Sequence, residues 1–510
     1  MEPFYYSCSF CFLLALVVHV VLRARATKQQ PRRRLPPGPW QLPIIGSLHH
    51  LLHGLPHRAM RDLSLRHGPL MLLRVCERVV VVVSSADAAR EIYKCHDAAL
   101  SERPGSPGID ELYRDGQGII FAPYGDHWRL LRRIVMTDLL SPRRVESFRR
   151  IREEEASRLV SSVRAATGGG GGVGVVVNVD QLLGKFMADS AVRAIFGDML
   201  PDRAAFLRMI KRGTELSSLF DLRDLFPSSR LTALLASCSG GKAERHRQDM
   251  FRLMDDILKQ HDERKATGDG DDNDKQDMVD VLLRIQSEGN VRVSLTHGVI
   301  RTFLADVLGA ALETSTTTLL WVMADLMANP KVMQKVQSEV HRVFTGHATV
   351  HEAALGNLYY LKAVIKETLR LHPPAPFFPR VCLEEGFSIQ GYDIPKGTIV
   401  LTNVWAISRD PKHWVEPNKY MPERFQGDCA ADFRGADFEF TPFGVGRRIC
   451  PGMNFSHANI EIALATLLFH FDWELPPGVN PEEVDMTELL GVTMKRKTEL
   501  LLCPIPRVSL

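Results

Sequence analysis

The chain has 510 residues, of which 45% are hydrophobic and 24% charged, so it can build a large core and is not biased toward disorder. Its net charge is only +3, and residues 1–34 hold six basic side chains against one acidic one, so the rest is slightly acidic. This balance argues against nucleic-acid binding. Nine scattered cysteines, an odd number, argue against a disulfide framework and favour a reducing environment.

An apolar segment opens the chain. Phe4–Leu22 has 19 residues and no charge, which is long enough to cross a membrane as a helix. The basic stretch that follows predicts a cytosolic body. A cleaved signal peptide is the alternative, since Ala24-Arg25-Ala26 resembles a cleavage site, but no basic segment precedes the apolar run. We predict a membrane anchor at 1–22, a basic and proline-rich linker at 23–40 that includes the stiff Pro36–Pro39, and one large domain at 41–510.

Hydrophobic periodicity in the body is mostly helical, with short strand patterns near each end. The predicted strands are Leu70–Val75, Val79–Val83, Phe387–Tyr392, Thr398–Leu401 and Leu500–Cys503, and the clearest helices are Trp128–Thr137, Gln181–Ile195, Val299–Met327 and Leu361–Leu371. Gly168–Gly174 contains a GxGxxG pattern without a preceding strand, and Gly268–Asp274 is polar, so both are predicted surface loops. The predicted fold class is mainly α with small β-sheets.

The long apolar helix predicted at Val299–Met327 has small residues on one face at its middle. Ala310, Ala311 and Thr314 lie on that face, where they leave room for a flat ligand. Glu313 directly precedes Thr314, which puts an acid beside an alcohol. A structural role is the alternative for Thr314, because its hydroxyl can simply bond to the Ala310 carbonyl.

Two pairs of residues lie one helical turn apart and so share a helix face. Trp128 and Arg132 are one pair, and Glu367 and Arg370 are the other. By themselves, Arg132 is an ordinary surface charge and Glu367–Arg370 an ordinary helix ion pair.

The strongest motif is Phe443–Gly452, a glycine-containing loop that ends at Cys450. A thiolate placed this way can be the axial ligand of a heme iron, where it pushes electron density onto the iron and favours O–O cleavage. Arg448 can meet a heme carboxylate and favours the ionised sulfur. A buried structural cysteine is the alternative. The loop resembles the heme-binding loop of the cytochrome P450 family at Phe443, Gly446, Arg448, Cys450 and Gly452.

The resemblance runs from the apolar segment to the last predicted strand and is closest to plant microsomal P450s of specialised metabolism. It implies the P450 fold after an N-terminal transmembrane helix, and heme b with the Cys450 thiolate as its iron ligand. The residues that it implies for heme binding are Cys450, Arg448, Trp128, Arg132, Arg380 and Phe443.

The resemblance also implies roles for the other motifs. Glu313 and Thr314 would relay protons, although Ala311 stands where the family usually has glycine. Glu367, Arg370 and Arg424 would form a structural charge network behind the heme.

The implied activity is a monooxygenase in the endoplasmic reticulum membrane, with a cytosolic catalytic domain. It would use O2 and electrons from NADPH that a separate flavoprotein, cytochrome P450 reductase, delivers. Eight arginines between Arg129 and Arg152 are the predicted docking face for the reductase, with an ordinary solvated basic face as the alternative. A reductase-independent heme isomerase or dehydratase of lipid hydroperoxides is an alternative function, and a non-catalytic heme protein is another.

Four segments are predicted to line the substrate pocket, and they are Pro104–Gly118, Phe303–Ala311, Ala375–Phe378 and Gly491–Met494. Because Phe303, Phe377, Phe378 and Val492 are apolar, the predicted substrate is lipophilic and neutral. A terpenoid, with diterpenoids favoured, comes ahead of indole-derived and phenolic compounds.

Overall fold

The computed structural model describes residues 34–112, 118–168, 174–198, 200, 203–217, 222–237, 241–266, 276–289, 295–427 and 430–507. The predicted anchor at 1–22, linker residues 23–33, the loop Gly268–Asp274 and most of Gly168–Gly174 lie outside the described residues.

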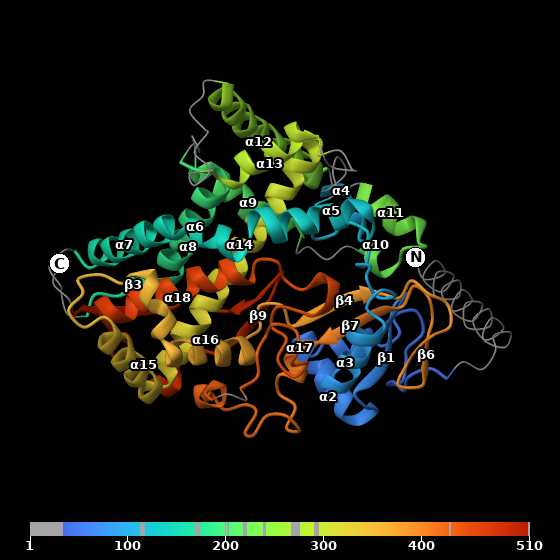
Figure 1. The fold of residues 1–510 in the computed structure, drawn as a ribbon. Helices are drawn as coiled ribbons and strands as arrows, with labels where there is room; N and C mark the ends of the chain where they lie inside the picture. Colours follow the sequence, from blue (N-terminus) through green and yellow to red (C-terminus); the bar gives the residue numbers. More distant parts are fainter. Residues whose placement is uncertain are drawn as a thin grey trace, which may run out of the picture.

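Helices dominate the described structure, as predicted (Figure 1). The α-helices are α2 Pro56–His67, α3 Ala86–Cys95, α4 Pro107–Leu112, α5 Asp126–Ile134, α6 Pro142–Ser147, α7 Arg149–Ala166, α8 Val179–Phe196, α9 Arg203–Ser217, α10 Leu222–Leu225, α11 Arg230–Ser237, α12 Lys242–Ala266, α13 Met278–Glu288, α14 His297–Ala328, α15 Pro330–Val343, α16 Tyr359–Leu371, α17 Val404–Ile407 and α18 Met453–His470. The shorter turns are the 3-10 helices η1 Leu48–Leu51, η3 Glu352–Asn357, η4 Pro422–Phe425, η5 Gly446–Arg448 and η6 Pro481–Glu483, and the π-helix η2 Val135–Leu139.

The strands form small separate sheets. They are β1 Leu70–Val75, β2 Arg78–Val83, β3 Val177–Asn178, β4 Phe377–Val381, β5 Phe387–Ile389, β6 Tyr392–Ile394, β7 Ile399–Asn403, β8 Phe471–Glu474, β9 Glu488–Leu490, β10 Met494–Arg496 and β11 Leu501–Pro506. The largest sheet has the order β1-β2-β7-β4, and the others are β10-β9, β3-β11-β8 and β5-β6. Figure 1 shows the largest sheet at one end of the molecule, with α7, α15 and α18 at the other.

The valine run Val79–Val83 explains why β2 lies inside the largest sheet. β-branched side chains favour strands, and those of β2 alternate between two hydrophobic clusters. Val81 and Val83 pack with Leu70 and Ile92 on one face, and Val80 and Val82 pack with Met71 on the other. A strand that is buried on both faces reads as an unbroken apolar run.

Helix α14 passes through the centre of the helical part (Figure 1) and packs against α8, α16 and α18. Its N-cap is Thr296, whose hydroxyl accepts the Val299 N–H. Among the described residues it is the one helix long and apolar enough to span a membrane, but more than half of its apolar stretch is buried in the protein. It is therefore a core helix, which matches the prediction for Val299–Met327.

Two details differ from the sequence prediction. Phe387–Tyr392 is not one strand, because Gln390 and Gly391 have φ angles of 49° and 74° and turn the chain between β5 and β6. The described end of the linker is not set apart from the body: Leu72 N–H donates to Pro37 O at 2.8 Å, and Gly38 has no room for a side chain beside Leu72.

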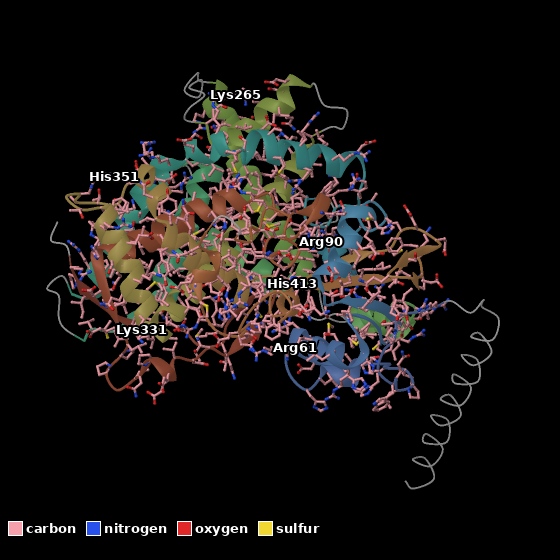
Figure 2. The ribbon with its side chains drawn as sticks, turned by 60° about the horizontal axis from the view of Figure 1, so that its bottom comes forward. Arg61, Arg90, Lys265, Lys331, His351 and His413 are labelled. Carbon is pink, nitrogen blue, oxygen red and sulfur yellow. The ribbon has the colours of Figure 1, made fainter. Side chains whose placement is uncertain are left out.

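Polar side chains cover the outside of the structure. The labelled Arg90, Lys265 and Lys331 are exposed and lie on α3, α12 and α15, at separate places on the surface (Figure 2). These cations are thus spread over the body rather than gathered on one element.

Candidate active site

The cysteine loop is held in a shape that needs glycine. Cys450 N–H donates to Phe443 O at 2.9 Å, which closes the loop before α18 begins. Gly444 and Gly446 have φ angles of 75° and 71°, and a Cβ on Gly446 would lie 2.5 Å from Asp97 Oδ1. The positive φ angles therefore explain the glycines at positions 444 and 446.

Burial and the neighbouring groups have opposite effects on the pKa of the Cys450 thiol. Burial raises its pKa, while the backbone N–H groups of Gly452 and Met453 and the positive charge of Arg132 act to lower it. Burial prevails, so these donors alone do not ionise the sulfur. A metal cation bound to the sulfur would supply the missing stabilisation, because a coordinating thiol is deprotonated outright.

Arg132 acts directly on the Cys450 thiol and also on Arg448, which forms a cluster with Arg103 and Arg380. Three carboxylates lie close enough to oppose this positive charge, and they are Asp97, Glu102 and Asp306. Burial, together with the charges of Arg380 and Arg448, lowers the pKa of Arg103 to about 9. Burial and the charges of Arg380 and Arg132 lower the pKa of Arg448 to about 10, against an opposing contribution from Glu102. Burial also lowers the pKa of Arg132. Burial and the mutual repulsion of the arginines outweigh the opposing carboxylates at Arg103 and Arg448, so both pKa values fall.

Two of these guanidinium groups have a buried N–H without a partner. Arg103 Nε and Arg380 Nε make no hydrogen bond within the described structure. Orphaned charged donors are costly, and carboxylates are their best partners. Heme carries two carboxylates, so the thiol and the arginines fit this group. The sequence analysis missed Arg103, because it lies in a loop without periodicity and only the fold brings it to Arg380.

Arg448 and Trp128 also fix the neighbouring loop. Arg448 donates through Nε to Ser101 O at 2.7 Å and through Nη2 to Ala122 O at 2.7 Å. Its guanidinium carbon lies 4.8 Å from the centre of the Trp128 ring, whose Nε1 donates to Ile119 O at 3.2 Å. The two side chains therefore tie Ser101, Ile119 and Ala122 to the cysteine loop.

The acid and alcohol lie at the middle of α14, where the helix surface opens. Thr314 Oγ1 donates to Ala310 O at 2.8 Å, which is the bond that the structural alternative required. Ala310 is exposed and Glu313 and Thr314 are half-buried, although both ends of this helix lie in the core. The next residue, Ser315, bonds to Ser456 of α18 at 2.9 Å. This bond joins the opened part of α14 to the helix that follows Cys450.

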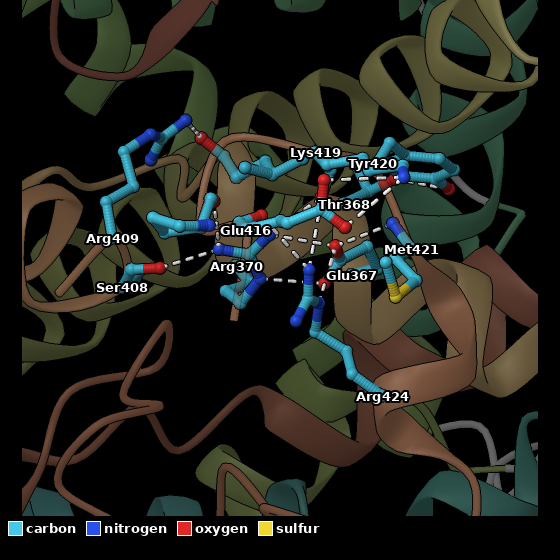
Figure 3. Close-up of polar contacts among 12 residues, drawn as sticks. Glu367, Thr368, Arg370, Ser408, Arg409, Glu416, Lys419, Tyr420, Met421 and Arg424 are labelled. Carbon is cyan, nitrogen blue, oxygen red and sulfur yellow. Dashed lines mark hydrogen bonds and ion pairs between the residues drawn. The ribbon is translucent and has the colours of Figure 1, made fainter. Parts of the chain in front are cut away.

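Glu367, Arg370 and Arg424 form the predicted charge network (Figure 3). Glu367 accepts from Arg370 Nε at 2.7 Å and Nη2 at 2.8 Å, and from Arg424 Nε at 3.0 Å. Arg370 Nη1 donates further to Ser408 O and Pro417 O, each at 2.7 Å. Glu367 and Arg370 are fully buried, so the network joins α16 to the chain after α17 and confirms the prediction.

Phe377 and Phe378 do not line the same pocket, which corrects the sequence expectation. They are successive residues of β4, so their side chains point to opposite faces. Phe377 packs with the cluster around Met71 and near the His57 ring, whereas the Phe378 ring lies beside Gly444 of the cysteine loop. Phe443 packs against Phe433 and His457, at ring distances of 5.1 and 5.4 Å.

The chain is similar to known proteins over most of its length. The family model described as Cytochrome P450 matches residues 36–503. Desmethyl-deoxy-podophyllotoxin synthase of Sinopodophyllum hexandrum is 44% identical over 99% of this chain and 97% of that protein. Ent-isokaurene C2/C3-hydroxylase of Oryza sativa subsp. japonica is 42% identical over 98% and 97%. A zebra fish cytochrome P450 solved with progesterone has a TM-score of 0.74 and 25% identity, over 89% of this chain and all of that one.

Proposed function

The chain belongs to the cytochrome P450 family and is a P450 monooxygenase, and we propose that it uses heme b bound through the Cys450 thiolate to oxidise a lipophilic plant specialised metabolite. The observation that carries this proposal is the pair of buried guanidinium N–H groups on Arg103 and Arg380 that lack acceptors, together with the buried Cys450 thiol beside Arg132. Bound heme would supply the oxygen activation, and the protein binds and orients the substrate.

The arginines divide into two roles in this proposal. Arg103 and Arg380 hold the heme propionates, because each has a buried N–H that awaits an acceptor. Arg132 lies close enough to Cys450 for the two charges to stabilise one another. Arg448 and Trp128 hold Ser101, Ile119 and Ala122 in place beside the site that heme would occupy.

In this proposal, Glu313 and Thr314 are the residues that take part in proton transfer. Thr314 gives its own hydrogen to the Ala310 carbonyl, so its oxygen is left to accept a hydrogen bond from a water or an oxygen ligand on the open side of α14. Glu313 is half-buried and can exchange protons with that side.

We propose a neutral terpenoid substrate, with diterpenoids favoured. Val307 and Ala311 are half-buried apolar side chains on the open part of α14. The similarity to ent-isokaurene C2/C3-hydroxylase supports a terpene hydrocarbon. A phenolic substrate is the second candidate, which the similarity to desmethyl-deoxy-podophyllotoxin synthase favours.

We also propose that NADPH–cytochrome P450 reductase supplies the electrons and that residues 1–22 anchor the protein in the endoplasmic reticulum membrane, with its body in the cytosol. Arg149 and Arg150 contribute exposed charge to the docking face and pair only with neighbouring glutamates of α7. Dependence on NADPH separates this function from a reductase-independent isomerase or dehydratase.

The test is a Soret titration of the purified heme-loaded protein with diterpene and sesquiterpene hydrocarbons, indoles and phenylpropanoids. A saturable shift toward high spin with ent-isokaurene or another diterpene would support the substrate proposal, and a shift with phenylpropanoids alone would replace it by the phenolic candidate. Cys450→Ser must abolish the thiolate signature of the ferrous carbon monoxide spectrum. Well-folded wild-type protein that takes up no heme would refute the central proposal.

A further inference from the structure

One hydrogen bond ties the acid of α14 to a distant part of the chain. Thr493 Oγ1 donates to Glu313 Oε1 at 2.9 Å, across 180 residues of sequence. Thr493 is 2% exposed, whereas Glu313 is half-buried. Because a carboxylate only accepts, the hydroxyl hydrogen of Thr493 must point at Glu313. A buried donor therefore sets where this carboxylate lies.

Thr493 is itself held firmly, at the turn between β9 and β10. Its carbonyl accepts the Gly491 N–H at 2.9 Å, which closes the turn. The next residue, Met494, donates its N–H to Pro374 O at 2.8 Å and accepts from Trp321 Nε1 at 3.1 Å. Trp321 lies eight residues after Glu313 on α14, so the turn is fixed to this helix at two points about two turns apart.

The far end of the same hairpin is anchored in the body. Glu488 of β9 accepts from Arg58 Nε at 2.8 Å, lies 3.1 Å from His57 Nε2 and accepts from Trp405 Nε1 at 3.3 Å. Burial acts to raise the pKa of Glu488, but His57 and Arg58 outweigh it and lower the pKa to about 2. The hairpin is thus a rigid support rather than a loose loop.

We propose that Thr493 is a positioning residue for the proton relay, which holds the Glu313 carboxylate in one orientation through the β9–β10 hairpin. This inference rests on the proposed function, since it assigns Glu313 a proton-handling role. Val492, which is predicted to line the substrate pocket, lies at the tip of the same turn, is 50% exposed and is adjacent to Thr493. The proposal therefore implies that Val492 and the Glu313 carboxylate move together. A ligand that displaces the turn would also displace the carboxylate.

The test uses the full-length protein and compares Thr493→Val, Thr493→Ser, Glu313→Ala and the double variant that combines Thr493→Val with Glu313→Ala. Valine keeps the shape and removes the donor, serine keeps the donor, and alanine removes the acceptor while favouring the helix. Thr498→Val is the matched control, because its hydroxyl bonds to Asp485 Oδ2 at 2.8 Å and is exposed. Two quantities are measured in each: amide hydrogen exchange at residues 488–496, and NADPH oxidation with reductase and ent-isokaurene as probe.

We expect Thr493→Val to raise exchange at the turn about tenfold, since a hydrogen bond to a charged group contributes at least that factor. Glu313→Ala should raise it equally, and the double variant no further. Thr493→Val and Glu313→Ala should each slow NADPH oxidation by the same factor. The double variant should be no slower than either of them. Thr493→Ser should restore both quantities, and Thr498→Val should change neither.

The positioning role is overturned if Thr493→Val changes neither quantity, or if its effect on NADPH oxidation multiplies with that of Glu313→Ala. Effects that multiply would mean that the two residues act independently. Wild-type protein without heme would overturn the proposed function instead, and the positioning role with it, even where the exchange measurements confirm the hydrogen bond. Heme content, measured first, therefore separates the two failures.

Discussion

Glu367→Gln should destabilise the protein strongly, because it removes the negative charge at the centre of the buried charge network. The two Glu367 oxygens accept from Arg370, from Arg424 and from the Met421 N–H at 2.8 Å. Glutamine keeps the size but carries no charge, and its amide group would face donors. Breaking a buried ion pair by removing one partner costs about 3–5 kcal/mol.

That cost is large beside the total stability of a protein, which is about 5–15 kcal/mol. The Arg370 side chain is fully buried and the Arg424 side chain is 9% exposed, so water does little to replace the lost charge. We expect a lower denaturation midpoint and a smaller yield of heme-loaded protein. Glu263→Gln is the control, because Glu263 pairs with Lys259 at the surface of α12 and both are largely exposed.

The assay is guanidinium denaturation followed by tryptophan fluorescence, together with the ferrous carbon monoxide spectrum of the purified variants. Equal midpoints for Glu367→Gln and Glu263→Gln would refute the reasoning, since they would mean that the buried guanidinium groups need no counter-charge. A lower midpoint with normal heme content in the surviving folded protein would confirm that the network is structural rather than catalytic.

Three further predictions follow from the structure. Arg103→Leu should lower the heme-to-protein ratio after dilution, whereas Arg90→Leu, at an exposed position of α3, should not. Unchanged heme retention in Arg103→Leu would exclude Arg103 from propionate binding. Thr314→Val should increase the hydrogen peroxide released per NADPH consumed. No increase would mean that Thr314 has only a structural role, through its hydrogen bond to the Ala310 carbonyl. Burial opposes charge on His261, but Asp277 and the Ile257 carbonyl outweigh it and raise its pKa. The contribution of His261 to stability should therefore be fully present below pH of about 6.5 and be lost as pH rises through the raised pKa. His261→Gln should remove this component of the pH dependence of the denaturation midpoint.

Local patterns in the sequence were enough to predict much of this molecule. The valine run of β2 predicts a strand, and the apolar periodicity of α14 predicts a helix, because both depend on neighbouring residues alone. The cysteine loop is equally local: its glycines and the Cys450–Phe443 backbone bond lie within a few residues. The ion pair between Glu367 and Arg370 could be predicted from the helix repeat alone.

Contacts that the fold creates could not be predicted from such patterns. Arg103 and Arg380 come from a loop and from β4, and nothing in either segment indicates the other. The Thr493–Glu313 bond is of the same kind. The error at Phe377 and Phe378 has a different cause, since strand alternation would have separated the two residues once Phe377–Val381 was recognised as a strand.

The arginines beside Cys450 link heme binding to folding. The charges of Arg380 and Arg448 lower the pKa of Arg103, and buried N–H groups of Arg103 and Arg380 lack hydrogen-bond acceptors, so burying these groups without an anionic partner costs folding free energy. A ligand that brings two carboxylates to these groups stabilises only the folded protein, and mass action then raises the apparent stability with heme concentration. The stabilisation by heme should therefore shrink in Arg103→Leu for two reasons, since the variant loses a propionate contact and its heme-free form also loses a repulsive charge. A heme-free Arg103→Leu protein that unfolds at a higher denaturant concentration than the heme-free wild type, while its heme-loaded form unfolds at a lower one, would demonstrate both contributions.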